Sequence, residues 1–226
     1  MAADAPTEGR TSVRRRGLAQ WAGLAGVAYV ILFIIGAIFS YGAGQPDTGS
    51  APEELISYYG DSGNRDKIAF GWILVLLGLF FFLWFVAGLR QAVGQLDGNG
   101  LLAVLTTIGG VVYAALALAA VSVNTAIKTM SDDTFQNTVY PELIHAADDT
   151  AYVLHSAGGI GAGAMMIAAS LAALRARVLP AWAGWLGVLL GIAALFSIFF
   201  LPQIGIAVWL VSAGAVLFLS PARQPV

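Results

Sequence analysis

Apolar residues in this chain gather into long, nearly uninterrupted stretches separated by short polar segments. A helix needs about 20 apolar residues to cross the roughly 30 Å hydrocarbon layer of a membrane. Six stretches meet this requirement, at about 18–40, 68–89, 101–123, 150–174, 181–200 and 204–220. The pattern predicts an all-α fold, a polytopic transmembrane helical bundle of six spans within a membrane domain of residues 18–220.

Two of the polar segments are long enough to carry structure of their own, at about 41–67 and 124–149. In the first, Ser50 and Glu53 have the spacing of a capping box, which predicts a short amphipathic helix. Its apolar side would carry Leu55, Ile56 and Tyr59. We expect this helix to lie on the outer membrane face and to cover the mouth of the bundle. The segment "LPQI" predicts a tight turn before the last span.

Positively charged residues favour one orientation. An even number of spans places both termini on the same side, and cytoplasmic segments are enriched in Lys and Arg. With both termini cytoplasmic, eight of the 11 Lys and Arg residues lie inside, leaving Arg65, Lys67 and Lys128 outside. The chain then has a basic cytoplasmic tail at 1–17 and a second cytoplasmic tail at 221–226. The apolar run after the first tail exceeds the about 7–15 apolar residues of a secretory signal, which predicts an uncleaved anchor.

The composition narrows the functional classes. Hydrophobic residues make up 58% of the chain and charged residues 11%, whereas soluble domains carry about 25% charged residues. A net charge of -2 with dispersed Lys and Arg argues against a nucleic-acid partner. The chain has no cysteine, which excludes disulfides, thiol chemistry and cysteine-held clusters. No cofactor is predicted, and membrane lipids are expected partners.

Glycines are abundant, 27 in all, and many lie inside the predicted spans. Small residues four positions apart let helix backbones approach closely in a membrane. Gly159 with Gly163, and Gly187 with Gly191, have this spacing and predict packing between the fourth and fifth spans. A similar pair in the first span adds that span as an expected contact partner.

The segment from Pro141 to Leu174 predicts one long helix, because Pro141 suits a first helical position and only glycines interrupt the pattern. Six polar residues near its start share one side, a sector of about 120°. They are His145, Asp148, Asp149, Tyr152, His155 and Ser156. His155 would lie below the membrane boundary, where an ionisable side chain usually faces the bundle interior and has a partner.

We therefore predict a ligand-binding group of Asp148, Tyr152 and His155 on this helix, joined by Asn124 from the end of the third span. Lys128 could reach the same level. A purely structural explanation stays open. In that case the aspartates favour the exposed end of the helix, and His155 bonds a neighbouring carbonyl group.

Metal and catalytic chemistry have weaker support. His145 and Asp149, four residues apart, form a weak alternative metal site. His155 lies about 15 Å further along the helix axis, so the two histidines cannot hold one ion. Neither an HExxH motif nor a GxSxG motif occurs in the chain. No catalytic residue is predicted.

The C-terminal third reads "VLPAWAGWLGVLLGIAALF" followed by "LPQIGIAVWLVSAG". It resembles uncharacterised six-span bacterial integral membrane proteins, described only as a domain of unknown function, that pair a Pro-x-Trp start of span five with a similar span six. The resemblance implies the six-span fold and its topology, and it brings no catalytic residues. Together with the alanine- and glycine-rich composition, it implies the cytoplasmic membrane of a bacterium.

These features favour a non-enzymatic bundle with an outward-facing polar pocket that binds a lipid, a small ligand or a partner protein. A small-solute transporter, or a subunit of one, is the second hypothesis. The third hypothesis is a metal-dependent membrane enzyme that acts at the outer face. A homo-oligomer is compatible with all three.

Overall fold

The computed structural model describes residues 18–42, 44–47 and 49–219. The predicted tails at 1–17 and 221–226 lie outside these residues. Within the described residues the chain forms seven α-helices and no strand. They are α1 (Leu18–Tyr41), α2 (Pro52–Gly60), α3 (Ser62–Leu96), α4 (Leu101–Lys128), α5 (Pro141–Arg175), α6 (Ala181–Ala194) and α7 (Phe200–Leu219).

Five of these helices, α1, α3, α4, α5 and α7, are long and apolar enough to cross a membrane. The remaining apolar helix, α6, corresponds to the fifth predicted span and has 14 residues. The all-α helical bundle is therefore confirmed, with five helices of membrane-crossing length among the described residues. The long helix predicted from Pro141 is also confirmed, because α5 begins at that residue.

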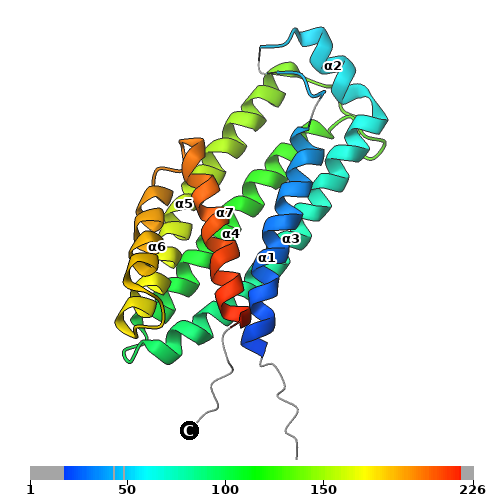
Figure 1. The fold of residues 1–226 in the computed structure, drawn as a ribbon. Coiled ribbons are helices and arrows are strands. Elements are labelled where there is room, and N and C mark those ends of the chain that lie inside the picture. The colour runs from blue at the N-terminus through cyan, green and yellow to red at the C-terminus, as the bar shows by residue number, and fades with distance from the viewer. Residues whose placement is uncertain (1–17, 43, 48, 220–226) are drawn as a thin grey trace, which may run out of the picture.

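The long helices run side by side, and α2 lies across one end of the bundle, which we call the α2 end (Figure 1). α1 packs mainly on α3 and α7, and α5 packs mainly on α4 and α6. The first span was expected to contact the fourth and fifth, but its extensive contacts are with α3 and α7 instead. The start of α1 and the end of α7 meet at the opposite end, where the ring centroids of Trp21 and Phe218 are 6.5 Å apart.

Glycines lie where helix backbones approach most closely. A Cβ atom on Gly163 of α5 would lie 2.6 Å from the carbonyl oxygen of Gly191 on α6. A real Cβ atom does not come so close to an oxygen, so the two backbones can touch only because no side chain intervenes. Gly159 and Gly187 lie in the same contact between α5 and α6, and Gly36 allows a similar approach of α1 to α3.

The short helix predicted in the first long connection is present as α2, but it begins differently. Ala51 occupies the N-cap position and has no side chain that could accept a hydrogen bond. The predicted capping box is therefore wrong, because Ser50 lies one residue too early to cap the helix. Pro52 starts the helix instead, with its φ angle already suited to the first turn.

The apolar side of α2 seals the α2 end of the bundle. Leu55 and Tyr59 are buried in a second hydrophobic cluster, whereas Ile56, expected on the same side, is exposed. The rest of the cluster comprises Ile68, Met130, Val139 and Ile144. Buried apolar contacts thus hold α2 against α3, α5 and the connection that follows α4.

The connection between α6 and α7 lies earlier than the sequence indicated. α6 ends at Ala194, residues 195–199 form turns, and α7 begins at Phe200. The prediction of a tight turn at "LPQI" is wrong, because Pro202 lies in the first turn of α7. Proline is tolerated there, since the first N–H groups of a helix have no acceptor within the helix.

Candidate functional site

An ion pair between a buried lysine and a half-buried aspartate links α4 to α5 near the α2 end. The side chain of Lys128 is only 2% exposed, and its Nζ atom lies 2.7 Å from Oδ1 of Asp148. Asn124 Nδ2 donates a hydrogen bond to the same oxygen, also at 2.7 Å. Asn124 and Lys128 are four residues apart on α4, so both side chains point toward α5. Two of the predicted site residues, Asn124 and Asp148, are thus in direct contact.

Aromatic and amide groups complete the surroundings of the Lys128 ammonium. The ring centroids of Tyr41 and Tyr59 lie 5.0 Å and 5.6 Å from Nζ, within the range of a cation–π interaction. Gln45 Oε1 accepts hydrogen bonds of 3.4 Å from Nζ and from the Tyr59 hydroxyl. Since a buried charge is costly without partners, these contacts and Asp148 together make the burial of Lys128 tolerable.

Tyr59 enters this group as a neutral hydrogen-bond donor. Burial raises the pKa of its hydroxyl group above the usual value, and the negative charge of Asp148 raises the pKa further. Both effects disfavour the phenolate form. The hydroxyl therefore keeps its proton at physiological pH and can donate a hydrogen bond to Gln45 Oε1.

No pattern in the sequence singled out Tyr41, Gln45 and Tyr59 as members of this site. They come from α1, the first long connection and α2, and only the folding of α2 over the bundle brings them to Lys128. One signal could have pointed to them. A lysine at the end of a membrane helix needs polar or aromatic partners, and the first connection is rich in both.

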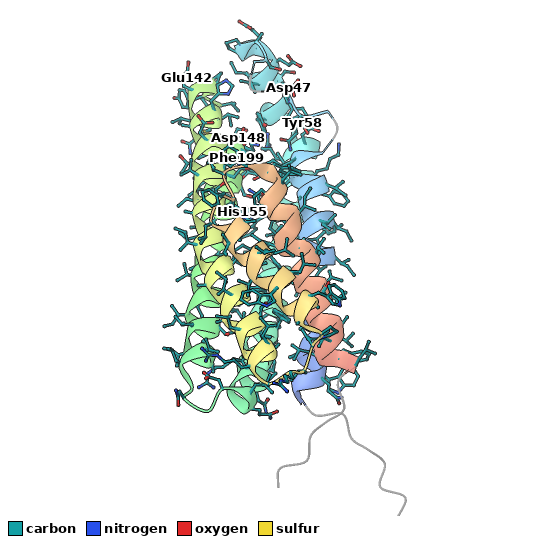
Figure 2. All side chains as sticks on the ribbon, turned by 60° about the vertical axis from the view of Figure 1, so that its left-hand side comes forward. Asp47, Tyr58, Glu142, Asp148, His155 and Phe199 are labelled. Atoms are coloured by element: carbon teal, nitrogen blue, oxygen red, sulfur yellow. The ribbon has the colours of Figure 1, made fainter. Side chains whose placement is uncertain are left out.

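A pocket with a volume of about 480 Å³ opens beside the ion pair. It is lined by Tyr41, Gly42, Gly44, Gln45, Pro46, Asp47, Lys128 and Asp148. The Asp148 side chain is 27% exposed, and its Oδ2 atom has no hydrogen-bond partner among the described residues. Figure 2 shows Asp47 and Asp148 near the same end of the bundle. This volume lies within the range of about 300–1,000 Å³ that is usual for small-molecule sites.

Tyr152, predicted to share a site with Asp148, points to a different part of the bundle. Its hydroxyl group donates a hydrogen bond to the carbonyl oxygen of Ile198 in the turn between α6 and α7. Ser156 Oγ and Gln203 Nε2 donate to the carbonyl oxygen of Ser197, at 3.3 Å and 3.0 Å. These side chains supply donors to two carbonyl groups of the turn that accept no backbone hydrogen bond among the described residues.

His155 lies deeper in the bundle than Asp148 (Figure 2). Its ring stacks on Phe33, with centroids 5.6 Å apart, and meets the edge of Tyr113 at 6.0 Å. The Tyr113 hydroxyl is paired with that of Tyr29 at 2.7 Å. No described residue forms a hydrogen bond with the ring nitrogens of His155. Its described contacts are therefore aromatic, and they lie below the pocket at the α2 end.

The weaker metal alternative rests on residues near the start of α5. His145 is half-buried and Asp149 is exposed. Among the described residues, no group of three or more metal-ligating His, Cys, Asp or Glu side chains occurs. The polar sector of α5 thus divides into an ion pair at Asp148, donors to the α6–α7 turn and an aromatic contact at His155.

Comparisons of the chain with protein-family models, with curated proteins and with solved structures found no match.

Proposed function

We propose that the protein crosses a bacterial cytoplasmic membrane six times, with both ends of the chain inside, as its resemblance to six-span bacterial proteins implies. In this proposal α6, with the turns after it, makes the fifth crossing. The positions of Arg90, Arg175 and Arg177, toward the end opposite α2, support the orientation, because basic residues are enriched in cytoplasmic segments. Ten carboxylates lie between residues 47 and 66 or between residues 132 and 149, in the segments proposed to lie outside.

The native chain has no cysteine, which makes this topology easy to test. Asp133→Cys lies in the connection before α5, and Gly98→Cys lies in the turn between α3 and α4, where a new side chain has open space. In intact cells, a membrane-impermeant maleimide should label the first variant and leave the second unlabelled until the cells are opened. The reverse labelling would invert the proposed orientation.

The function that the geometry supports best is binding of a small polar molecule with a positively charged amino group, in the pocket at the α2 end. The observation that carries this proposal is the pair of buried Lys128 and half-buried Asp148 at the edge of a pocket of about 480 Å³. A membrane bundle tolerates a buried charge at considerable cost, and such charges usually mark functional sites.

The charges of the pocket favour a cation. Asp148 is matched by Lys128, while Asp47 forms no ion pair with any described residue, so the lining carries one unmatched negative charge. The free Oδ2 atom of Asp148 and the ring of Tyr41 are further groups that attract an ammonium ion. The surrounding carboxylates raise the local concentration of cations.

The proposed binding is tested on the purified protein. Choline and putrescine serve as cationic probes, and acetate serves as an anionic control. A ligand at about 100 times its dissociation constant stabilises a protein by about 2.7 kcal/mol, which a thermal unfolding assay detects. Asp47→Asn should abolish the stabilisation by the two cations. Glu142→Gln makes the same change of charge at an exposed position outside the pocket and serves as the control.

Equal stabilisation by acetate, or unchanged stabilisation of Asp47→Asn, would contradict the proposal. Loss of the effect in Glu142→Gln as well would assign it to the general acidic surface. A transport function has less support, because Phe82, Phe85, Met165 and Met166 are fully buried at a level below the pocket. They form part of the main hydrophobic cluster, so this part of the described core is filled mainly by apolar side chains.

A further inference from the structure

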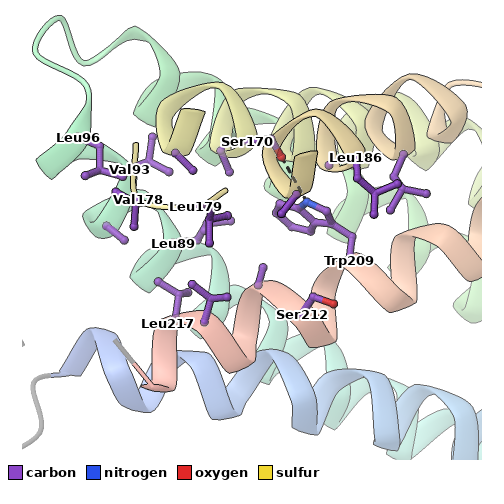
Figure 3. A pocket seen from close by; sticks show the side chains of 18 of the residues that line it. Leu89, Val93, Leu96, Ser170, Val178, Leu179, Leu186, Trp209, Ser212 and Leu217 are labelled. Atoms are coloured by element: carbon purple, nitrogen blue, oxygen red, sulfur yellow. Dashed lines mark hydrogen bonds between the residues drawn. The ribbon is translucent and has the colours of Figure 1, made fainter. Parts of the chain in front are cut away.

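A second cavity lies toward the opposite end of the bundle, between α3, α5, α6 and α7, and has a volume of about 550 Å³ (Figure 3). Leu89, Val93 and Leu96 of α3 line one wall, and residues of α6 and α7 face them. Leu186 on α6 and Val208 on α7 also line the cavity and are 47% and 55% exposed. The cavity therefore opens at the surface of the bundle rather than being enclosed in the core.

Three polar side chains that line this cavity form hydrogen bonds within the protein. Trp209 Nε1 donates a hydrogen bond of 3.4 Å to Ser170 Oγ (Figure 3). Ser212 Oγ donates to the carbonyl oxygen of Val208 at 2.8 Å. Most other lining residues are aliphatic, so the interior suits a hydrocarbon chain better than a polar solute. Gly187 makes room for this arrangement, because a Cβ atom there would collide with Ser170 Oγ.

Three arginines lie close in the sequence to lining residues of the cavity. Arg175 and Arg177 lie between Ala173 and Val178, which both line it, and Arg90 directly precedes the lining residue Gln91. All three arginines are exposed, and none forms an ion pair with a described residue. The carboxylate nearest in sequence, Asp97, is buried and accepts a hydrogen bond of 2.6 Å from the backbone of Leu102. Asp97 thus bonds the first turn of α4 and forms no ion pair with a described arginine.

We propose that this cavity is a binding site for one anionic phospholipid from the membrane leaflet at that end. An acyl chain occupies the apolar interior, and the phosphate group lies against Arg175 and Arg177. Gln91 and Gln95, one turn apart on the exposed edge of α3, are placed to bond the glycerol and ester oxygens. Basic pockets between membrane helices select anionic headgroups in this way, because each nearby Lys or Arg adds to the attraction.

Phosphatidylglycerol and phosphatidylcholine with identical chains are the probes. The protein is purified in a non-ionic detergent, stripped of lipid and titrated with each probe, and binding is followed by native mass spectrometry. Phosphatidylglycerol should bind about tenfold more tightly, as expected from the attraction of two exposed arginines. Double substitution of Arg175→Gln and Arg177→Asn should bring the two affinities close together. Asparagine suits position 177 because its backbone has a positive φ of 52°.

The site for the acyl chain is tested separately from the site for the headgroup. Ala213→Phe places a ring in the cavity and should weaken binding of both lipids at least tenfold, whereas Val211→Phe, on the same helix but outside the lining, should not. Lys67→Gln removes a positive charge at the α2 end and should keep the preference for phosphatidylglycerol. Unchanged binding in Ala213→Phe, or an unchanged preference in the arginine double variant, would overturn the proposal.

If Ala213→Phe does not fold, a measurement on the unsubstituted protein still tests the acyl-chain site. Phosphatidylglycerol with brominated chains quenches nearby tryptophans, and Trp209 lines the cavity. Quenching should saturate at one lipid per protein and should be smaller in Trp209→Phe. Equal quenching in both proteins overturns the proposed acyl-chain site. The proposal is also overturned if two copies of the protein associate through this cavity and the lipid does not bind.

Discussion

Substitution of Asp148 by asparagine isolates the contribution of the ion pair at the α2 end. Asparagine has nearly the size of aspartate and keeps an oxygen that can accept the hydrogen bond from Asn124. It removes the negative charge 2.7 Å from Lys128, whose side chain stays buried. The ammonium would then have Gln45, two tyrosine rings and a neutral amide oxygen as partners, with no negative charge beside it.

The expected loss of stability follows from the burial of the two partners. Removing one member of a fully buried ion pair costs about 3–5 kcal/mol, because the other charge is left uncompensated. Asp148 is 27% exposed, so water screens part of its charge, and we expect a loss of about 2–3 kcal/mol. This corresponds to a decrease of about 30- to 150-fold in the ratio of folded to unfolded protein.

Reversible unfolding in mixed micelles of a mild detergent and dodecyl sulfate measures the free energy of unfolding. Asp149→Asn, at the neighbouring exposed position, has the same change of charge and should lose less than about 0.5 kcal/mol. The double variant Lys128→Met with Asp148→Asn removes both charges and should recover most of the stability that Asp148→Asn loses.

Two results would refute this reasoning. If Asp148→Asn is as stable as the unaltered protein, the pair is not buried as the structure has it. If the double variant is no more stable than Asp148→Asn, the loss does not come from an uncompensated lysine charge.

Three further substitutions probe other contacts, all by the same unfolding assay. Gly163→Ala should lower the free energy of unfolding by at least about 2 kcal/mol, because its new methyl group would meet a carbonyl oxygen on α6 at 2.6 Å. Gly60→Ala, where the methyl group meets open space, should be nearly neutral and serves as the control. Tyr113→Phe leaves the buried hydroxyl of Tyr29 unpaired and should cost about 1–3 kcal/mol, and adding Tyr29→Phe should restore part of that loss. Tyr152→Phe should cost about 1 kcal/mol and speed hydrogen exchange in the α6–α7 turn, and unchanged exchange there would argue against its bond to that turn.

Local chemistry made several elements predictable. The start of α5 at Pro141 and the position of α1 follow from proline geometry and from apolar runs, which act within a few residues of each position. The α6–α7 connection was misplaced because proline is compatible both with the first turn of a helix and with a loop, so Pro202 does not distinguish the two. The capping box failed for a similar reason, since Pro52 provides an equally good helix start two residues after Ser50.

The polar sector of α5 shows what helical periodicity can predict and what it cannot. Helical periodicity grouped Asp148, Tyr152 and His155 on one side of the helix, but a sector of that width faces more than one neighbour. Asp148 meets α4, Tyr152 meets the turn after α6, and His155 meets an aromatic ring on α1. Which neighbour lies opposite each turn depends on how the helices cross, and no pattern within α5 carries that information.

The sequence by itself determined that this chain is a bundle of long apolar helices, because the hydrophobic length of each helix is a property of its own residues. It also placed Asn124, Lys128 and Asp148 at one end of the bundle. Only the tertiary structure decided that Tyr41, Gln45 and Tyr59 surround the ammonium of Lys128 and that a cavity opens toward the opposite end. Both features arise between segments distant in the chain, where packing and the pairing of buried charge select the arrangement.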